Sequence, residues 1–571
     1  MGPVEGLVRA PGVGAHEADD PGADDGELGQ PVHVVRVPLD ACAARVTGVR
    51  ESPRRAGVCA SDMVPGAGIA FRPSLPTFRP CDLPPVGSSP FSTNHQAIHT
   101  NTGISSIPAY TVGSMAVETR VPDDDCEALT GWGRTAPTLA RVYRPRSPAE
   151  VAAALRAPGA RGAIARGLGR AHGDAARNAG GTVLDMTGLD RIRAVDARAG
   201  LVDCEAGVSL HRLMELLLPL GRFVPVVPAT RYVTVGGAIA GDVHGGNQHT
   251  AGSFGRHVVS LELLTPDGEV RTVRPGTPLF DATTGGLGLT GVILSAVLRL
   301  PAVETSLMRV DTERARDLDD LLGRLAGGDH RYAYSTARID LLARGAATGR
   351  AVLTRGDHAP YDALPRRHPA RRAPLAFRPV RLPAPPPYVP GGLLGGASAG
   401  LFHALWHRAS PRAAAGRFRP LSGFFHPLDA VPHWNRLYGP GGAVPYRFVL
   451  PYGREEVLRG IVRRIAGRRF VPPAVLQRFG PGGPGPLSFA LPGWSLALDL
   501  PAGLPGLGAL LDALDEEVAE AGGRVQPVGD ARVRPEVLAA MYPRLDEFRA
   551  LRAALDPRSV LVSDLSRRLG L

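Results

Sequence analysis

The sequence has few cysteines and no long apolar run, and each shortage excludes a class of protein. Its five cysteines in 571 residues form no CxxC pair, which argues against a disulfide scaffold or a zinc site, and no metal is expected. No stretch of about 18 apolar residues is present, so a membrane-spanning helix is not expected. The first residues, Met1 to Glu5, lack the basic and apolar regions of a signal peptide. We therefore expect a cytoplasmic protein, with any membrane contact peripheral and at the inner face.

The chain carries a formal net charge of +11, and its basic residues are mostly arginine. Two interpretations are open: a compositional bias, or attraction to an anionic partner such as phosphate groups or a lipid surface. Nucleic acid is not expected, because no basic helix, aromatic stacking platform or zinc-finger spacing accompanies the charge. With 44% hydrophobic residues, the chain is long enough for about two domains with real cores.

Local patterns predict several helices and strands after residue 138. Ser147 and Pro148 predict a helix start, and leucines on one side predict an amphipathic helix over 208–218. The turn at Asp267 and Gly268 predicts a hairpin over 258–273. Further strands are expected at 444–451, 488–491 and 494–500, and a helix at 507–520.

Two stretches are dense in glycine and other small residues. Residues 225–258 hold almost no bulky side chain between Thr234 and Ala251, and residues 165–181 form a second such loop between two strand-like segments. Glycine allows the backbone to approach a ligand closely and to aim its N–H groups at phosphate without a helix N-terminus. No helical period follows either stretch, so neither is a Rossmann dinucleotide loop. The two loops predict a site for a flat or anionic ligand.

The order of motifs resembles that of a known enzyme family. The motifs fall at residues 131–137, 166–170, 228–231, 234–240, 244–245 and 251–255. In this order they resemble the vanillyl-alcohol-oxidase type of FAD-dependent oxidoreductase, and most of all the decaprenylphosphoryl-β-D-ribose 2-oxidases of cell-wall arabinan synthesis. The likeness runs from about Leu129 to the C-terminus. It implies an α+β, two-domain FAD-binding fold of the PCMH type, with an antiparallel-sheet substrate domain.

The resemblance and the composition together predict the domain organisation. Residues 1–118 are rich in Gly, Pro, Asp and Ser and are expected to be a disordered extension, and Met115 offers an alternative translation start. Residues 119–302 are expected to bind FAD, 303–530 to form the substrate domain, and 531–571 to return to the FAD domain. Within the substrate domain, residues 355–396 are rich in Pro and Arg and are expected to form a loop, either a solvated insertion or a lid or membrane-facing arm.

The resemblance implies FAD as the cofactor and a set of residues around it. Hydroxyl groups in this set can donate hydrogen bonds to phosphate oxygens, and its glycines expose N–H groups. The implied cofactor residues are Trp132, Arg166, Gly167, Leu168, Gly169, Arg170, Ala171, His172, Gly173, Asp174, Asn178, Thr230, Thr234, Gly236, Gly237, Ala240, Gly241, Val243, His244, Ser253 and Ile293.

His172 carries a separate hypothesis. The ribose oxidases usually have Tyr here and hold FAD without a covalent bond, whereas related alditol oxidases use the His of an L-G-x-x-H loop to bond the flavin. Residues 168–172 match that form. His172 is therefore either covalently flavinylated or packed on the flavin ring as Tyr would be.

The resemblance also implies catalytic and substrate residues, with departures. His244 would accept a proton or bind a sugar hydroxyl, although a role in bracing its turn is the alternative. Two pocket lysines of the ribose oxidases fall at Gly529 and Gln477, so Arg447 or Arg532 is the candidate replacement cation near the flavin. The implied substrate pocket comprises His426, Gln477, Ser495 and Ala497.

The predicted function is oxidation of a CH–OH group to a carbonyl by an FAD-dependent oxidoreductase. The first candidate substrate is a polyprenyl-phosphate pentose, and the alternative is a free polyol, aldose or aldonolactone. The resemblance implies a short-chain reductase partner for the keto product. A different class also stays open, a non-catalytic flavin-fold partner, because both pocket lysines are missing.

Overall fold

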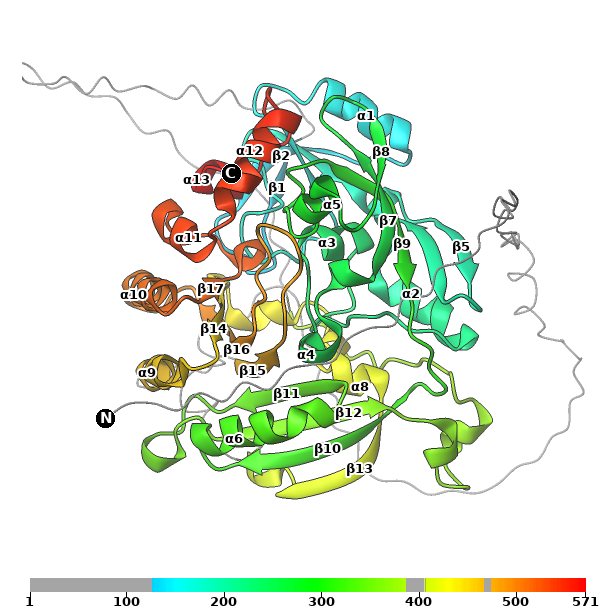
Figure 1. Cartoon of the computed structure of the whole chain (residues 1–571), viewed down its shortest axis with the longest axis vertical. Helices are drawn as coiled ribbons and strands as arrows, with labels where there is room; N and C mark the ends of the chain where they lie inside the picture. The colour runs from blue at the N-terminus through cyan, green and yellow to red at the C-terminus, as the bar shows by residue number, and fades with distance from the viewer. Residues whose placement is uncertain (1–125, 387–404, 406, 467–473) are drawn as a thin grey trace, which may run out of the picture. The chain divides into compact units, whose positions relative to one another are not determined.

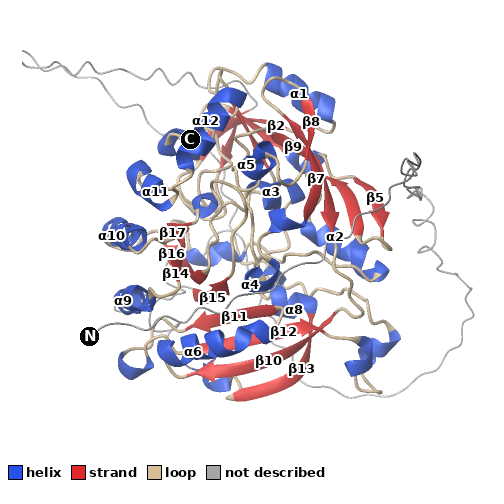
Figure 2. Cartoon of the chain, viewed as in Figure 1, coloured by secondary structure: helices blue, strands red, loops and turns tan. Residues whose placement is uncertain are grey.

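The computed structural model describes residues 126–386, 405, 407–466 and 474–571. The predicted N-terminal extension and part of the Pro/Arg-rich segment lie outside these residues. Helices and strands alternate along the described chain (Figure 2), as the α+β class predicted.

The first half contains two sheets. The four-stranded sheet has the order β1-β2-β4-β3, from β1 (Cys126–Leu129), β2 (Thr138–Tyr143), β3 (Ala163–Arg166) and β4 (Thr182–Asp185). The five-stranded sheet has the order β5-β6-β9-β7-β8, from β5 (Ile192–Asp196), β6 (Leu201–Glu205), β7 (Val258–Leu264), β8 (Val270–Val273) and β9 (Val292–Arg299). Because β3 and β4 pair in parallel, the loop between them can close over one edge of its sheet.

The helices of this half begin where the sequence predicted. Ser147 caps α1 (Pro148–Arg156) by accepting a hydrogen bond from the Glu150 N–H, and Pro148 occupies the first turn. Four buried residues of α2 (Leu210–Leu217) form its apolar side. The shorter helices are α3 (Val235–Ala240), α4 (Gln248–Ala251) and α5 (Pro278–Thr283).

The second half is built on one eight-stranded sheet of order β13-β10-β12-β11-β15-β16-β14-β17 (Figure 1). Its strands are β10 (Leu307–Ala315), β11 (Tyr334–Ile339), β12 (Ala351–His358), β13 (Ala413–Pro420), β14 (Ala443–Pro451), β15 (Ala474–Phe479), β16 (Gly493–Pro501) and β17 (Arg524–Val525). The paired strands are antiparallel throughout.

One face of this sheet is covered by helices. Leu476, Leu496 and Phe448 share a core with Leu458 and Leu511 of the helices. The helices of this half are α6 (Leu318–Gly328), α8 (Leu421–Phe425), α9 (Glu455–Ala466) and α10 (Leu507–Glu520). Since strand side chains alternate, the residues between these core positions face the other way, toward the predicted cofactor loops.

The C-terminal segment contacts the first half again. It contains α11 (Pro535–Met541), α12 (Leu545–Leu555) and α13 (Asp564–Leu569). The Asp564 carboxylate accepts a hydrogen bond from the Ala179 N–H at 2.8 Å, and Arg568 pairs with buried Asp174 at 3.0 Å. The last helix thereby holds the β3–β4 loop in place.

Three sequence predictions of local structure were wrong. The Pro/Arg-rich loop does not begin at Arg355, because β12 continues to His358 and pairs with both neighbours; Arg355 is neutralised there by Glu313 and Asp329. Residues 488–491 form no strand. The stretch 234–251 is not a plain loop, because α3 and α4 lie within it and the Thr234 side chain caps α3. Small residues kept these short helices from showing an apolar period.

We predict that Asp174→Asn lowers the free energy of unfolding by about 2 kcal/mol, because it removes one of the two carboxylates, with Asp530 the other, that neutralise the largely buried Arg568. Asp546→Asn is the matched control: its carboxylate is 93% exposed beside Arg549, so a change of roughly 0.5 kcal/mol or less is expected. Urea unfolding of both variants measures this. Equal effects of the two substitutions would contradict the assigned role of Asp174.

Candidate functional site

The two glycine-rich loops touch each other. A Cβ added to Gly167, directly after β3, would collide with the Thr234 hydroxyl at the start of α3. A Cβ on Gly173 would collide with the Asp530 carbonyl, which belongs to the second half of the chain. Only glycine fits at these two points, so the loops that the sequence placed together do lie in contact.

The three hydroxyl residues of the loops differ in what they can still donate. Thr230 and Thr234 accept hydrogen bonds from the N–H groups of Tyr232 and Gly237, at 3.2 and 3.1 Å. Thr230 is partly exposed, so its own hydrogen is free for a phosphate, whereas Thr234 is buried. The Ser253 hydroxyl instead donates to buried Asp242 at 2.7 Å. Thr230 therefore fits the predicted role better than the other two do.

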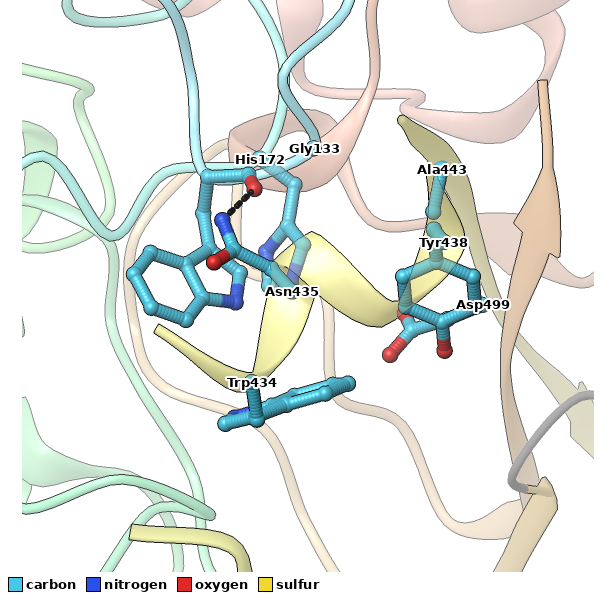
Figure 3. Close-up of a pocket in the computed structure, with 8 residues that line it drawn as sticks. Gly133, His172, Trp434, Asn435, Tyr438, Ala443 and Asp499 are labelled. Carbon is cyan, nitrogen blue, oxygen red and sulfur yellow. Dashed lines mark hydrogen bonds between the residues drawn. The ribbon is translucent and has the colours of Figure 1, made fainter. Parts of the chain in front are cut away.

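Trp132 and Arg170 join the loops to the second half of the chain. The Arg170 guanidinium carbon lies 3.8 Å from the centre of the Trp132 ring, and its Nε donates to the Tyr232 carbonyl at 3.2 Å. The Asn435 side-chain amide donates to the Trp132 carbonyl at 2.8 Å, the hydrogen bond drawn in Figure 3. The loop positions are thus fixed from both halves.

The side chains of several predicted cofactor residues form hydrogen bonds within the protein. Arg166 donates to the carbonyls of Thr130 and Ala176, and Asn178 donates to the Gly162 carbonyl. Together with Asp174, they give the loop its shape. Of the other predicted residues, Leu168, Gly169 and Ala171 belong to the β3–β4 loop, Gly236, Gly237 and Ala240 to α3, Gly241 and Val243 to the turn after it, and Ile293 is buried in β9.

Both predicted histidines are neutral. Burial, followed by the nearby Arg447 charge, lowers the pKa of His244 to about 3. Burial and the charges of Arg447 and Arg170 also hold the pKa of His172 well below its ordinary value. The His244 ring lies 4.8 Å from the Phe479 ring and 5.6 Å from the Phe489 ring, between centres. A neutral imidazole in an apolar wall can accept a hydrogen bond through its unprotonated ring nitrogen, but the burial disfavours its protonation.

Arg447 is the cation whose charge lowers the pKa of both histidines. Its guanidinium donates to the Gln526 side-chain oxygen at 3.4 Å, and among the described residues no carboxylate lies within ion-pair distance. The chain contains no lysine, since all 65 of its Lys and Arg positions are arginine. Any fixed positive side chain of the site must therefore be an arginine.

Arg532, the other predicted catalytic cation, does not join the site. Its guanidinium pairs with Asp512 and Asp515 of α10. Those two carboxylates neutralise the Arg532 guanidinium, which leaves Arg447 as the candidate cation of the site. Sequence alone could not separate Arg532 from Arg447, because the carboxylates that neutralise Arg532 lie in another element, α10.

Three of the four predicted pocket residues share one face of the second-half sheet. Gln477 pairs with Ser495 across β15 and β16, and Ala497 pairs with Arg447 across β16 and β14. The Gln477 amide donates to the Gly245 carbonyl at 3.5 Å, directly after His244. His426 is different: it is buried near Arg231 and His211. It is not brought beside the other three by any contact among the described residues.

A small cavity shows two residues that sequence reasoning missed. Figure 3 shows Tyr438 and Asp499 close together on one side of it, with His172 and Trp434 on the other. Burial raises the pKa of Asp499, and Arg447 opposes that shift. Alternation along 494–500 was the available signal, because it places Asp499 on the same face as Ser495 and Ala497. Tyr438 lies in an irregular segment and gave no such signal.

Comparison with known proteins decides what these loops bind. A family model described as an FAD binding domain matches residues 139–274. Decaprenylphosphoryl-β-D-ribose oxidase of Mycolicibacterium smegmatis is 43% identical over 453 residues, covering 78% of this chain and 97% of that protein. The chain belongs to this family of FAD-linked oxidoreductases. The predicted cofactor is therefore confirmed, and the alternative of a non-catalytic binding partner is not supported.

Two further relatives differ in how much of this chain they match. An uncharacterized protein in the mprA 5′ region of Streptomyces coelicolor is 56% identical over 374 residues, covering 64% of this chain and all of that protein. Alditol oxidase of a Streptomyces species is 30% identical over 180 residues, covering 31% of this chain and 43% of that enzyme.

The residues present fit FAD. The two glycine-rich loops meet at Gly167, and the partly exposed Thr230 hydroxyl suits a phosphate oxygen. Neutral His172 and His244 suit a flat aromatic ring. No helix among the described residues is long and apolar enough to cross a membrane.

We predict that His244 causes no inflection in the pH profile of flavin reduction between pH 5 and 8. Its folded pKa of about 3 keeps the imidazole neutral throughout that range, and protonation would disable it only near pH 3. Stopped-flow reduction of the enzyme and of His244→Gln measures this. A wild-type inflection near pH 6.5 that disappears in the variant would contradict the assignment.

Proposed function

We propose that this FAD-linked oxidoreductase oxidises a CH–OH group of a polyprenyl-phosphate sugar to a carbonyl. The supporting observation is the likeness to decaprenylphosphoryl-β-D-ribose oxidase, which covers 97% of that enzyme and thus both of its halves. The alditol oxidase aligns with this chain over only 180 residues, and L-gulono-1,4-lactone dehydrogenase of Mycobacterium tuberculosis over only 197. A soluble alditol or aldonolactone is therefore the second candidate substrate.

The site residues divide the chemical work between them. When bound, FAD supplies the hydride acceptor. A ring nitrogen of neutral His244 accepts a hydrogen bond from the substrate hydroxyl, whose proton leaves to water because burial disfavours the imidazolium, and Phe479 and Phe489 flank the His244 ring. Arg447 provides positive charge that favours the negative charge developing during the reaction. Gln477 and Ser495 would bind sugar hydroxyls.

Two partners belong to the same proposal. The keto product would be consumed by a short-chain reductase, which returns a hydroxyl at the oxidised carbon. A phosphate-bearing lipid substrate requires the enzyme to work at a membrane surface, and the net charge of +11 favours contact with an anionic lipid face.

We expect a polyprenyl-phosphate pentose to bleach the flavin absorption of the purified enzyme without oxygen. Xylitol and an aldonolactone should bleach it at least about tenfold more slowly at equal concentration, since they lack the anionic group. Anaerobic stopped-flow absorbance compares the three. Faster bleaching by either soluble sugar would move the assignment to the second candidate.

A second proposal concerns how the cofactor is held: we propose that a ring nitrogen of His172 would bond the 8α-methyl carbon of FAD in place of one methyl hydrogen, with release of two protons and with two electrons passing through the flavin to its electron acceptor. Its neutral imidazole supports this, because an unprotonated ring nitrogen is the nucleophilic form. Acid-precipitated protein should stay yellow, whereas His172→Tyr should release its flavin. Yellow supernatant and colourless wild-type pellet would show that His172 only packs on the ring.

A further inference from the structure

Arg338 lies on the same sheet face as the pocket residues. It pairs with Val475, Val475 pairs with Ala497, and Ala497 pairs with Arg447, so one row crosses β11, β15, β16 and β14. Directly paired side chains of neighbouring strands point to the same face. With three strand spacings, the two arginine Cα atoms are about 14 Å apart. A cation therefore stands at each end of a row whose middle is Val475 and Ala497.

The turn that carries His244 lies against this row. The Ser335 N–H of β11 donates to the Gly246 carbonyl at 2.8 Å, and Gln477 of β15 donates to Gly245. Arg338 follows Ser335 by three residues, or about 10 Å along the strand. An arginine side chain can span much of that distance. Arg338 thus lies on the strand that the turn after His244 contacts, three residues beyond the point of contact.

The charge of Arg338 is not neutralised by the protein. Its side chain is exposed, and among the described residues it forms no ion pair or hydrogen bond. Surrounding protein atoms and the neighbouring Arg419 cation lower its pKa, and Arg419 likewise has no carboxylate partner within the described ranges. On the opposite face of this sheet, Arg355 has Glu313 and Asp329. Two nearby unpaired cations favour an anionic ligand.

We propose that Arg338 binds the phosphate of the substrate, while the sugar lies over Val475 and Ala497 toward His244 and Arg447. This inference rests on the proposed function, and it identifies the subsite that distinguishes a phosphate-bearing sugar from a soluble one. A guanidinium suits this task because it presents several N–H donors to phosphate oxygens at once.

The test measures binding by calorimetry, with FAD-loaded enzyme and three probes: farnesyl phosphate, farnesol and inorganic phosphate. Arg338→Gln should weaken farnesyl phosphate binding about tenfold or more, since one charge-assisted contact is lost. Farnesol binding should not change. Weakened inorganic phosphate binding would show that the subsite reads the phosphate itself, and an unchanged value would show that it needs the lipid ester.

Arg309→Gln is the matched control, because Arg309 is an exposed arginine of β10 on the opposite face of the sheet. It should leave all three affinities unchanged. Equal farnesyl phosphate affinity in wild type and Arg338→Gln, or equal losses in both variants, would overturn the proposal.

Turnover separates this inference from the proposed function. With the polyprenyl-phosphate pentose, Arg338→Gln should raise KM about tenfold with kcat within twofold, and any oxidation of xylitol should be unchanged. If no sugar bleaches the flavin, the proposed function fails, yet the calorimetry still decides whether Arg338 binds phosphate.

Discussion

The site depends on two loops that approach closely enough to leave their main chain bare. Gly167 lies against Thr234, and Gly173 against the Asp530 carbonyl, so a side chain at either glycine would push the loops apart. Further contacts, from Arg166 to backbone carbonyls and from Asp174 to Arg568, fix the same loop. A flat, phosphate-bearing cofactor can then meet N–H groups and hydroxyls rather than bulky side chains.

The charges of the site follow from this geometry and from the fact that arginine is the chain's only strongly basic residue. Burial makes His172 and His244 neutral, and the Arg447 charge acts in the same direction on both. Arg447 and Arg338 stay without carboxylate partners among the described residues, whereas Arg355 and Arg532 are neutralised by pairs of acids. Within the second-half sheet, Arg355 is thus neutralised on the helix side, whereas Arg447 and Arg338 lie on the pocket side.

Much of this arrangement could be predicted from local sequence. The Ser147 cap, the hairpin at Asp267 and the alternation of 494–500 were correct, because each depends on neighbouring residues. The predictions that failed depended on distant partners. The sequence predicts a loop at Arg355, because the acidic partners of Arg355 are distant in sequence. It also predicts a catalytic role for Arg532, because the neutralisation of Arg532 by α10 is a tertiary contact. Arg338 was overlooked because only strand register places it in line with Arg447.

The close contact at Gly167 is the central claim, and the FAD content of a single variant tests it directly. Gly167→Val should give protein with an unchanged far-ultraviolet circular dichroism spectrum that holds far less FAD than the wild type, which should carry one FAD per chain. The absorbance ratio of flavin to protein measures the FAD content of the variant and of the wild type. A folded Gly167→Val protein with full FAD content would contradict the account, because it would show that the loops need not touch to bind the cofactor.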